Sequence, residues 1–294
     1  MTLTGTCRRA QAPGSLAVVA LTLTRITRYP IKSCRGQAMD TAVVEPWGLA
    51  GDRRWMLVDE RNQAVTAREY PQLVLVTPQF TSDGLLVRAP DVDELKVCIP
   101  MGAALCDVDV FSSVLTAAPA SDHAHVWFST VVGQPVRLVY LDDPTQRRPN
   151  PAYSRAQDRV SFADGYPLLL ATAESLAALN ELIAAGPRAE EGPVSMTRFR
   201  PNLVVSGAAA WAEDGWRQLR IGAARFRVAK GCDRCVLTTV DPDTAATGRE
   251  PLATLVRHRR WDGKSWFAIN LIPDSLGATV QVGDPVEIVA EAPY

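Results

Sequence analysis

The chain has 294 residues, of which 47% are hydrophobic and 21% charged, and its formal net charge is −1. This composition is typical of a folded globular protein and excludes a mainly disordered chain. The balanced charge also excludes an overall positive field that would attract nucleic acid or an anionic membrane. We therefore expect neither partner, and any bound anion needs a local cluster of cations.

Three features of the sequence bear on localisation. Six cysteines are too few for a disulfide-rich scaffold of this length, which favours a reduced, intracellular protein. No stretch approaches the roughly 20 apolar residues needed to span a bilayer. Residues 8–21 resemble a weak export signal, but the apolar run continues into an alternating strand and no clear cleavage site follows. We expect a disordered leader over residues 1–20 and a cytoplasmic protein.

Short alternating runs at regular spacing dominate the first half of the chain and predict a β-barrel or sandwich over residues 21–141. The expected strands are 21–28, 41–45, 55–59, 64–67, 73–77, 85–89, 95–99, 105–110 and 130–140. Residues 117–125 lose this pattern and are predicted to form a surface loop. His123 and His125 within it have the spacing of a metal-binding pair on an extended segment, but no third ligand is near in sequence.

The polar segment 142–159, rich in Pro, Arg and Asn, is predicted to connect this domain to a second one over 160–292. The clearest helix of the chain lies there, because Thr172 is suited to cap a run whose apolar face is Leu176, Leu179, Leu182 and Ile183. A shorter helix is expected over 250–258. The expected strands are 168–172, 203–206, 236–240, 267–271 and 286–289. The fold is therefore predicted to be mainly β with a few helices.

Two polar segments in the first half are candidates for binding an anion. Lys32 and Ser33 lie in a loop with Gly36, which is free to take a positive φ; such a grouping suits a phosphate, although a plain surface turn is favoured. Arg53 and Arg68 flank the predicted hairpin. Charged residues at strand tips are usually solvated, and the alternative is that both are directed into a site.

A third candidate for anion binding is the segment Arg198-Phe-Arg200-Pro-Asn202. In an extended conformation both guanidinium groups face one side while the ring of Phe199 is buried on the other. Arginine offers a fork of donors that suits an oxyanion, and Asn202 adds an amide donor. Binding and surface solvation are equally consistent with this pattern.

Cys232 and Cys235 form a C-x-x-C pair between two β-rich runs. A reactive dithiol needs its first thiolate at a helix N-terminus, and a structural zinc site needs two further soft ligands that the sequence does not supply. A single thiolate ligand to a metal carried by a cofactor needs only one of the two cysteines. Two buried, inert cysteines are the remaining interpretation.

Four separated motifs resemble the MOSC family, named for the molybdenum cofactor sulfurase C-terminal domain. They are KGCDRCVLTTVDPDT at 230–244, RFRPNLVV at 198–205, YPIKSCRG at 29–36 and GDRRW at 51–55. The first two are similar to the MOSC domain and the last two to the β-barrel domain that precedes it. The pattern resembles most the mitochondrial amidoxime reducing components and their bacterial relatives, and the likeness covers residues 21 to 289.

This resemblance implies two β-barrel-like domains with a molybdenum–pterin cofactor, Mo-molybdopterin, in the cleft between them. The family's molybdenum-ligating cysteine falls on Cys235, and its acidic residue close to the metal falls on Asp164. Its cofactor-anchoring residues fall on Lys32, Ser33, Arg53, Arg200 and Asn202. We add Arg198 to the expected cofactor-binding residues because it shares a predicted face with Arg200. Gly165 and Tyr166 depart from the small hydroxyl residues that the family often has there, which puts one phosphate contact in doubt.

The resemblance also implies two-electron reduction of N-hydroxylated compounds such as amidoximes and hydroxylamines. Asp164 is expected to deliver a proton, a role that needs a raised pKa. Because the chain reaches Tyr294 without a ferredoxin-type cysteine cluster, we expect electrons from a separate ferredoxin-, flavodoxin- or cytochrome-type partner. The alternatives are a carrier of the cofactor or of its sulfur without turnover, and a metal-free binding module.

Overall fold

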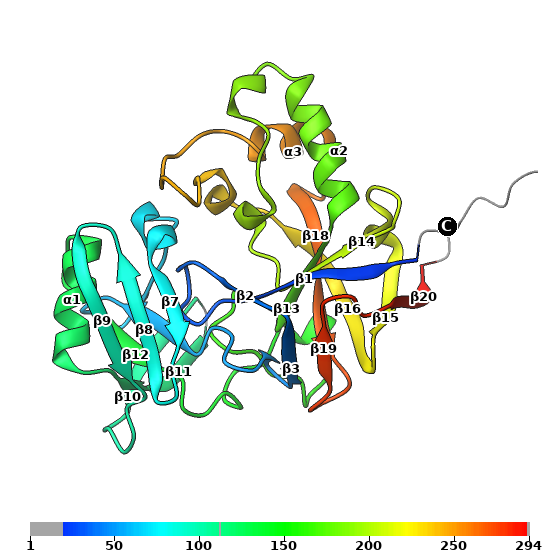
Figure 1. Cartoon of the computed structure of the whole chain (residues 1–294). Coiled ribbons are helices and arrows are strands. Elements are labelled where there is room, and N and C mark those ends of the chain that lie inside the picture. The colour runs from blue at the N-terminus through cyan, green and yellow to red at the C-terminus, as the bar shows by residue number, and fades with distance from the viewer. Residues whose placement is uncertain (1–19, 112, 293–294) are drawn as a thin grey trace, which may run out of the picture.

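The computed structural model describes residues 20–111 and 113–292 (Figure 1). Within these residues the protein is mainly β, with three α-helices, as predicted. The predicted leader lies outside the described residues. The domain boundaries at 141/142 and 159/160 stay predictions. No helix in the described ranges is long and apolar enough to cross a membrane.

A large sheet forms one body of the molecule, on the right of Figure 1. Its strands in spatial order are β2 (Gln37–Met39), β1 (Thr22–Arg28), β14 (Leu203–Ser206), β13 (Leu168–Thr172), β18 (Lys264–Pro273), β16 (Ala224–Asp233), β15 (Trp216–Ile221) and β20 (Val286–Glu291), with β17 (Arg260–Trp261) paired to β18. Only β13 and β14 pair in parallel. Because β1, β2 and β20 all belong to this sheet, the first and the last described strands lie in the same body.

The other body, on the left of Figure 1, contains two smaller sheets. One has the strands β10 (Cys106–Val110), β11 (Ser113–Pro119), β12 (Arg137–Tyr140), β5 (Trp55–Val58) and β6 (Ala64–Val65), and the other has β7 (Thr77–Phe80), β8 (Gly84–Ala89) and β9 (Val92–Cys98). A further sheet of β19 (Thr279–Gln281), β3 (Thr41–Glu45) and β4 (Gly48–Leu49) joins early and late segments. In β9, Leu95 and Val97 are buried while their neighbours are exposed, which is the alternation of a half-buried strand.

The helices are positioned by caps and apolar faces. Thr172 caps α2 (Ala173–Ala184) by accepting from the Ser175 N–H, and Leu179 and Ile183 are buried, as the sequence predicts. The short α3 (Leu252–His258) also matches its predicted position. Single turns of 3-10 helix are η1 (Pro71–Leu75), η2 (Pro151–Tyr153), η3 (Ala189–Glu191), η4 (Met196–Phe199), η5 (Ala212–Gly215) and η6 (Val236–Thr239).

The predicted surface loop over 117–125 is wrong. Ser121 caps the helix α1 (Asp122–Val132), which buries Trp127 and Phe128 in the core of the body that contains the two smaller sheets. The strand predicted over 130–140 is therefore shortened to β12. The reason is that burial of the two aromatic side chains stabilises the helix by more than the low helix propensity of the valines in α1 destabilises it.

Two further predicted strands are also wrong. Residues 73–77 are mostly η1, and residues 236–240 are mostly η6. Both segments are short apolar runs, and periodicity alone does not distinguish such a run from a buried turn. The second difference matters for function, because it places Cys235 at the start of a helical turn rather than between two strands.

Candidate functional site

Lys32 is the buried centre of the site. Its side chain is 4% exposed, and Nζ donates to the Phe162 carbonyl at 2.8 Å and to Asp164 Oδ1 at 2.5 Å. Burial lowers the pKa of Lys32 to about 8, although Asp164 opposes the shift. The ammonium group is therefore held where it faces a carboxylate and a carbonyl.

The rest of the Lys32 loop is structural. Ser33 takes the positive φ of 71° and its Oγ accepts from the Ala67 N–H at 3.0 Å, so it fixes the residue before Arg68. Gly36 does not use a positive φ, contrary to the prediction. A Cβ there would lie 2.6 Å from the ring of Tyr29, so glycine is required by close packing instead.

Asp164 connects the lysine to a second cation. Its Oδ2 accepts from Arg68 Nη2 at 2.6 Å, and the carboxylate remains 59% exposed. Desolvation acts to raise the pKa of Asp164, but Lys32 and Arg68 outweigh it and hold that pKa well below its usual range. The expectation of a raised pKa is therefore wrong. Asp164 is an ionised acceptor in this arrangement, and Lys32 is the group whose pKa lies close to neutral.

Arg68 brings this chain of contacts to the cysteine pair. Its Nε lies 3.3 Å from Cys235 Sγ, so one guanidinium contacts both Asp164 and the thiol. Cys232, at the end of β16, accepts instead from Arg234 Nη1 at 2.8 Å, and burial raises the pKa of Cys232. The two cysteines thus have separate environments, and only Cys235 joins the cluster of Lys32, Asp164 and Arg68.

Arg147 is a site residue that the sequence analysis missed. It is 6% exposed and donates to the carbonyls of Ser161, Ala163 and Asp164 at 3.0, 2.5 and 2.7 Å. These bonds shape the loop from which Asp164 projects. No sequence signal distinguishes Arg147 from its neighbours in the connecting segment, because the carbonyls that it binds are defined only by the folded loop.

A second group, which we call the Asp52 clasp, consists of Tyr29, Asp52, Arg53, Arg200 and Asn202. Fully buried Asp52 accepts from the Tyr29 N–H at 2.7 Å, from Asn202 Nδ2 at 3.1 Å and from Arg53 at 2.5 Å. The guanidinium groups of Arg53 and Arg200 lie 4.3 and 4.4 Å from the ring centre of Tyr29. Asn202 Nδ2 also donates to the Thr27 carbonyl, so its amide is used within the fold.

The extended conformation predicted for the segment of Arg198 and Arg200 is wrong. Residues 196–199 form η4, and Arg200 follows with a φ of 56°, so the two arginines do not alternate along a strand. Arg198 donates to the Thr239 carbonyl at 3.0 Å and to Asp241 at 2.9 Å, which supports the segment after Cys235. The stacking of Phe199 on Phe267, with ring centres 3.9 Å apart, fixes this turn.

Phe162 joins the clasp to the site through its backbone. Its N–H donates to the Arg53 carbonyl at 3.0 Å, and its carbonyl accepts from Lys32. The predicted residues Lys32, Arg53, Asp164, Arg200, Asn202 and Cys235 are therefore brought together from five separate segments, since Arg200 and Asn202 share one. Ser33 and Arg198 bond to neighbouring segments instead.

The donor set fits a cofactor that carries both an anionic group and its own metal. In the described ranges, no group of three or more His, Cys, Asp and Glu side chains is placed to hold a metal ion, so Cys235 would be a lone protein ligand. Arg147 and Arg234 each have a buried Nε without a hydrogen-bond partner among the residues described. Arg68, Arg147, Arg200 and Lys32 outnumber the carboxylates near them, which suits a phosphate.

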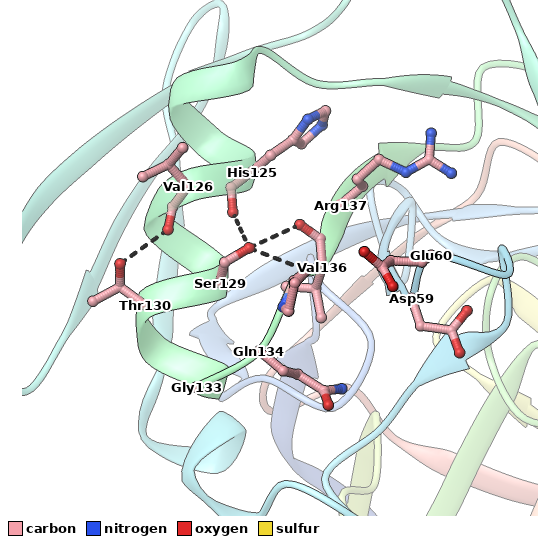
Figure 2. Close-up of a pocket in the computed structure, with 11 residues that line it drawn as sticks. Asp59, Glu60, His125, Val126, Ser129, Thr130, Gly133, Gln134, Val136 and Arg137 are labelled. Carbon is pink, nitrogen blue, oxygen red and sulfur yellow. Dashed lines mark hydrogen bonds between the residues drawn. The ribbon is translucent and has the colours of Figure 1, made fainter.

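A groove of about 630 Å³ lies apart from this cluster, between α1 and the turn after β5 (Figure 2). His125 lies in it with Nε2 3.3 Å from the Leu138 carbonyl, and burial lowers the pKa of His125. Ser129 Oγ contacts the His125 and Val136 carbonyls, as Figure 2 shows. These bonds tie α1 to β12, so the polar groups here serve the fold.

Comparisons with known proteins identify the family. Residues 20–135 match the MOSC N-terminal beta barrel domain and residues 157–287 match the MOSC domain. The chain is 33% identical to mitochondrial amidoxime-reducing component 1 of Xenopus laevis, over 88% of this chain and 79% of that protein. It is 34% identical to mitochondrial amidoxime reducing component 2 of Bos taurus, over 90% and 82%.

A third relative is larger. The chain is 32% identical to the molybdenum cofactor sulfurase of Oryza sativa subsp. japonica, over 87% of this chain and 33% of that protein. Lys32 lies in the part matched by the MOSC N-terminal beta barrel domain, and Asp164 and Cys235 lie in the part matched by the MOSC domain. The chain therefore belongs to the MOSC family, with a MOSC N-terminal beta barrel domain followed by a MOSC domain.

Proposed function

We propose that the protein is a molybdenum-cofactor-dependent reductase of N-hydroxylated compounds such as amidoximes and hydroxylamines. The observation that carries this proposal is the chain of contacts from Lys32 through Asp164 and Arg68 to Cys235 Sγ. It places a single thiol beside cations that suit a phosphate-bearing cofactor. The similarity to the amidoxime-reducing components supports the choice of substrate.

In the proposed reaction, one N–O bond breaks with two electrons and two protons, and the products are the parent base and water. A bound molybdenum cofactor would supply the two-electron chemistry at this site. Cys235 Sγ would be its protein ligand, and Lys32, Arg53 and Arg200 would hold its anionic parts. Arg147 keeps the loop of Asp164 in position.

The protein's own groups also define where protons are held. Asp164 stays ionised between its two cations and accepts hydrogen bonds. Lys32 Nζ carries a proton below about pH 8 and is hydrogen-bonded to the exposed carboxylate. When the Lys32–Asp164 pair gives a proton to the reaction, solvent replaces that proton at the exposed carboxylate. We therefore assign proton supply to this pair rather than to a protonated Asp164.

The test uses protein from a host that makes the cofactor. We expect molybdenum by elemental analysis, pterin by fluorescence, and reduction of benzamidoxime to benzamidine with dithionite-reduced methyl viologen. Cys235→Ala should abolish turnover and remove or disorder the metal, whereas Cys232→Ser should keep most of the activity. A metal-replete and active Cys235→Ala protein would contradict the proposal.

The match to the rice sulfurase supports a second candidate, a carrier of the cofactor or its sulfur without turnover. Such a protein would contain molybdenum and pterin but leave benzamidoxime unchanged. It would also transfer the cofactor to a cofactor-free acceptor enzyme. The same preparation therefore separates the two functions.

A further inference from the structure

A surface beside Cys235 combines exposed cations with stacked tryptophans. We call it the hairpin face and define it as Lys230, Arg260, Trp261, Lys264 and Trp266. Trp261 is 43% exposed and stacks on Trp266, with ring centres 5.8 Å apart and planes at 19°. Lys230 Nζ lies 5.2 Å from the Trp266 ring centre, and Arg260 and Lys264 are exposed.

This face is attached directly to the strand that ends at the cysteines. In the pairing of β16 with β18, Asp233 lies opposite Trp266, and the Arg234 N–H donates to the Ser265 carbonyl at 2.8 Å. Cys235 is the next residue. The β17–β18 hairpin is therefore bonded to the backbone that leads directly into the proposed metal ligand.

Cations predominate on this face and on the segment next to it. Asp233 is shared between Lys230 at 3.2 Å and Lys264 at 3.6 Å, and Arg260 makes no ion pair with the described residues. The ring of Tyr153, in the connecting segment 142–159, lies 5.6 Å from Lys230 Nζ, so this part of the segment lies beside the hairpin face.

That segment adds the exposed cations Arg148 and Arg155. Of its carboxylates, Asp158 is paired with Arg227 at 2.8 Å, while Asp142 and Asp143 are exposed, and Arg155 is itself paired with Asp274 at 3.3 Å. On the hairpin face, Lys230, Arg260 and Lys264 outnumber the carboxylates Asp233 and Asp262, so the face is locally positive on a chain whose net charge is −1.

We propose that the hairpin face is the docking site of a separate acidic one-electron carrier protein. The inference rests on the proposed function, because such a carrier would deliver in two encounters the two electrons that break the N–O bond, and each carrier molecule is oxidised by one electron. Exposed tryptophan and cationic side chains are the residues that carry binding energy at protein interfaces, and a positive face attracts an acidic partner.

The experiment compares two reductants on the same cofactor-loaded protein. One is dithionite-reduced methyl viologen, and the other is an acidic [2Fe–2S] ferredoxin kept reduced by its reductase. The test variant is Arg260→Glu/Lys264→Glu. The control is Lys96→Glu, an equally exposed lysine on β9 in the other body.

We expect the double variant to lower the ferredoxin-supported kcat/KM by on the order of tenfold at low salt, because steering by complementary charge contributes factors of that size or more. The methyl viologen rate should stay within about twofold of wild type, which also shows that the variant is folded and loaded. Trp261→Ala should weaken only the ferredoxin-supported rate. Rising salt should slow that rate for the wild type and have little effect on the double variant.

An unchanged ferredoxin-supported rate in the double variant, or an equal loss in Lys96→Glu, would overturn the docking site and leave the reductase standing. Loss of binding to phosphatidylglycerol vesicles with an unchanged ferredoxin rate would assign the face to a membrane and equally overturn the proposal. A wild type inactive with both reductants would overturn the reductase itself, and the docking site with it.

Discussion

Asp52 and Asp164 are each bonded to an arginine, yet they lie in opposite environments. Asp52 is fully buried and its partners are donors inside the protein, whereas Asp164 is 59% exposed and projects from a loop that Arg147 holds in place. The Asp52 carboxylate is therefore used within the fold, whereas Arg53 and Arg200 beside it keep their proposed role toward the cofactor. The arrangement around Asp164 leaves acceptor capacity facing solvent beside Cys235. The comparison teaches that an aspartate bonded to arginine stabilises the fold where it is buried and is available for chemistry where it is exposed to solvent.

The largest effect expected from this comparison is a loss of stability when the Asp52 clasp is disrupted. Asp52→Ala removes the acceptor for the Tyr29 N–H, Asn202 and Arg53, so we expect the free energy of unfolding to fall by about 3–5 kcal/mol. Urea denaturation measures it. Asp52→Asn keeps an acceptor and should lose less. A loss below about 1 kcal/mol for the alanine variant would show that the clasp is not structural.

The matched change at the open site should alter activity more than stability. Asp164→Ala is expected to reduce benzamidoxime turnover by about tenfold or more, because the proton-supplying pair is broken. Its free energy of unfolding should fall by less than that of Asp52→Ala, by about 1–3 kcal/mol, because the carboxylate is exposed although buried Lys32 loses a partner. Equal stability losses in the two alanine variants would remove the distinction between clasp and site.

The next test uses pH. The pKa of Lys32 is lowered from 10.5 to about 8, so between these values the unfolded chain binds a proton that the folded chain has released. Stability contributed by this group therefore rises with pH across that window. Wild type should gain stability relative to Lys32→Met as the pH rises from 7 to 10 in thermal unfolding.

The control for that measurement is Lys96→Met. Lys96 is exposed and its pKa is raised by Asp83, so its replacement should not reproduce the gain. If the difference in stability between wild type and Lys32→Met stayed constant with pH, Lys32 would not be the desolvated group that the geometry indicates.

The smallest effect is expected at the groove beside α1. His125→Ala removes one contact to the Leu138 carbonyl, so we expect a stability loss of about 1 kcal/mol and unchanged turnover. Circular dichroism melting and the benzamidoxime assay check the two parts. A marked loss of turnover would make this groove, and not the Cys235 cluster, the active region.

Much of the fold was predictable where local patterns agree with tertiary packing. The α2 helix follows from a threonine cap and an apolar stripe, and most strands from alternation. The sequence analysis failed at α1 and η6, where aromatic burial and a tight turn override β-like composition. For the site, the sequence analysis named Lys32, Asp164 and Cys235, which lie in one chain of contacts, but it did not name Arg147. It also expected an extended segment at Arg198 and Arg200, where residues 196–199 form a 3-10 turn and Arg200 adopts a left-handed conformation.

By itself, the sequence determined the family and the mainly β fold, because these depend on residue types at fixed spacings, and it led to the proposal of Cys235 as the thiol ligand. Only the tertiary structure decided that Arg68 joins Asp164 to Cys235, that Arg147 shapes the loop, and that the pKa of Asp164 is lowered. The physical reason is that pKa values and hydrogen bonds depend on through-space distance and burial, and these side chains come from segments far apart in the chain.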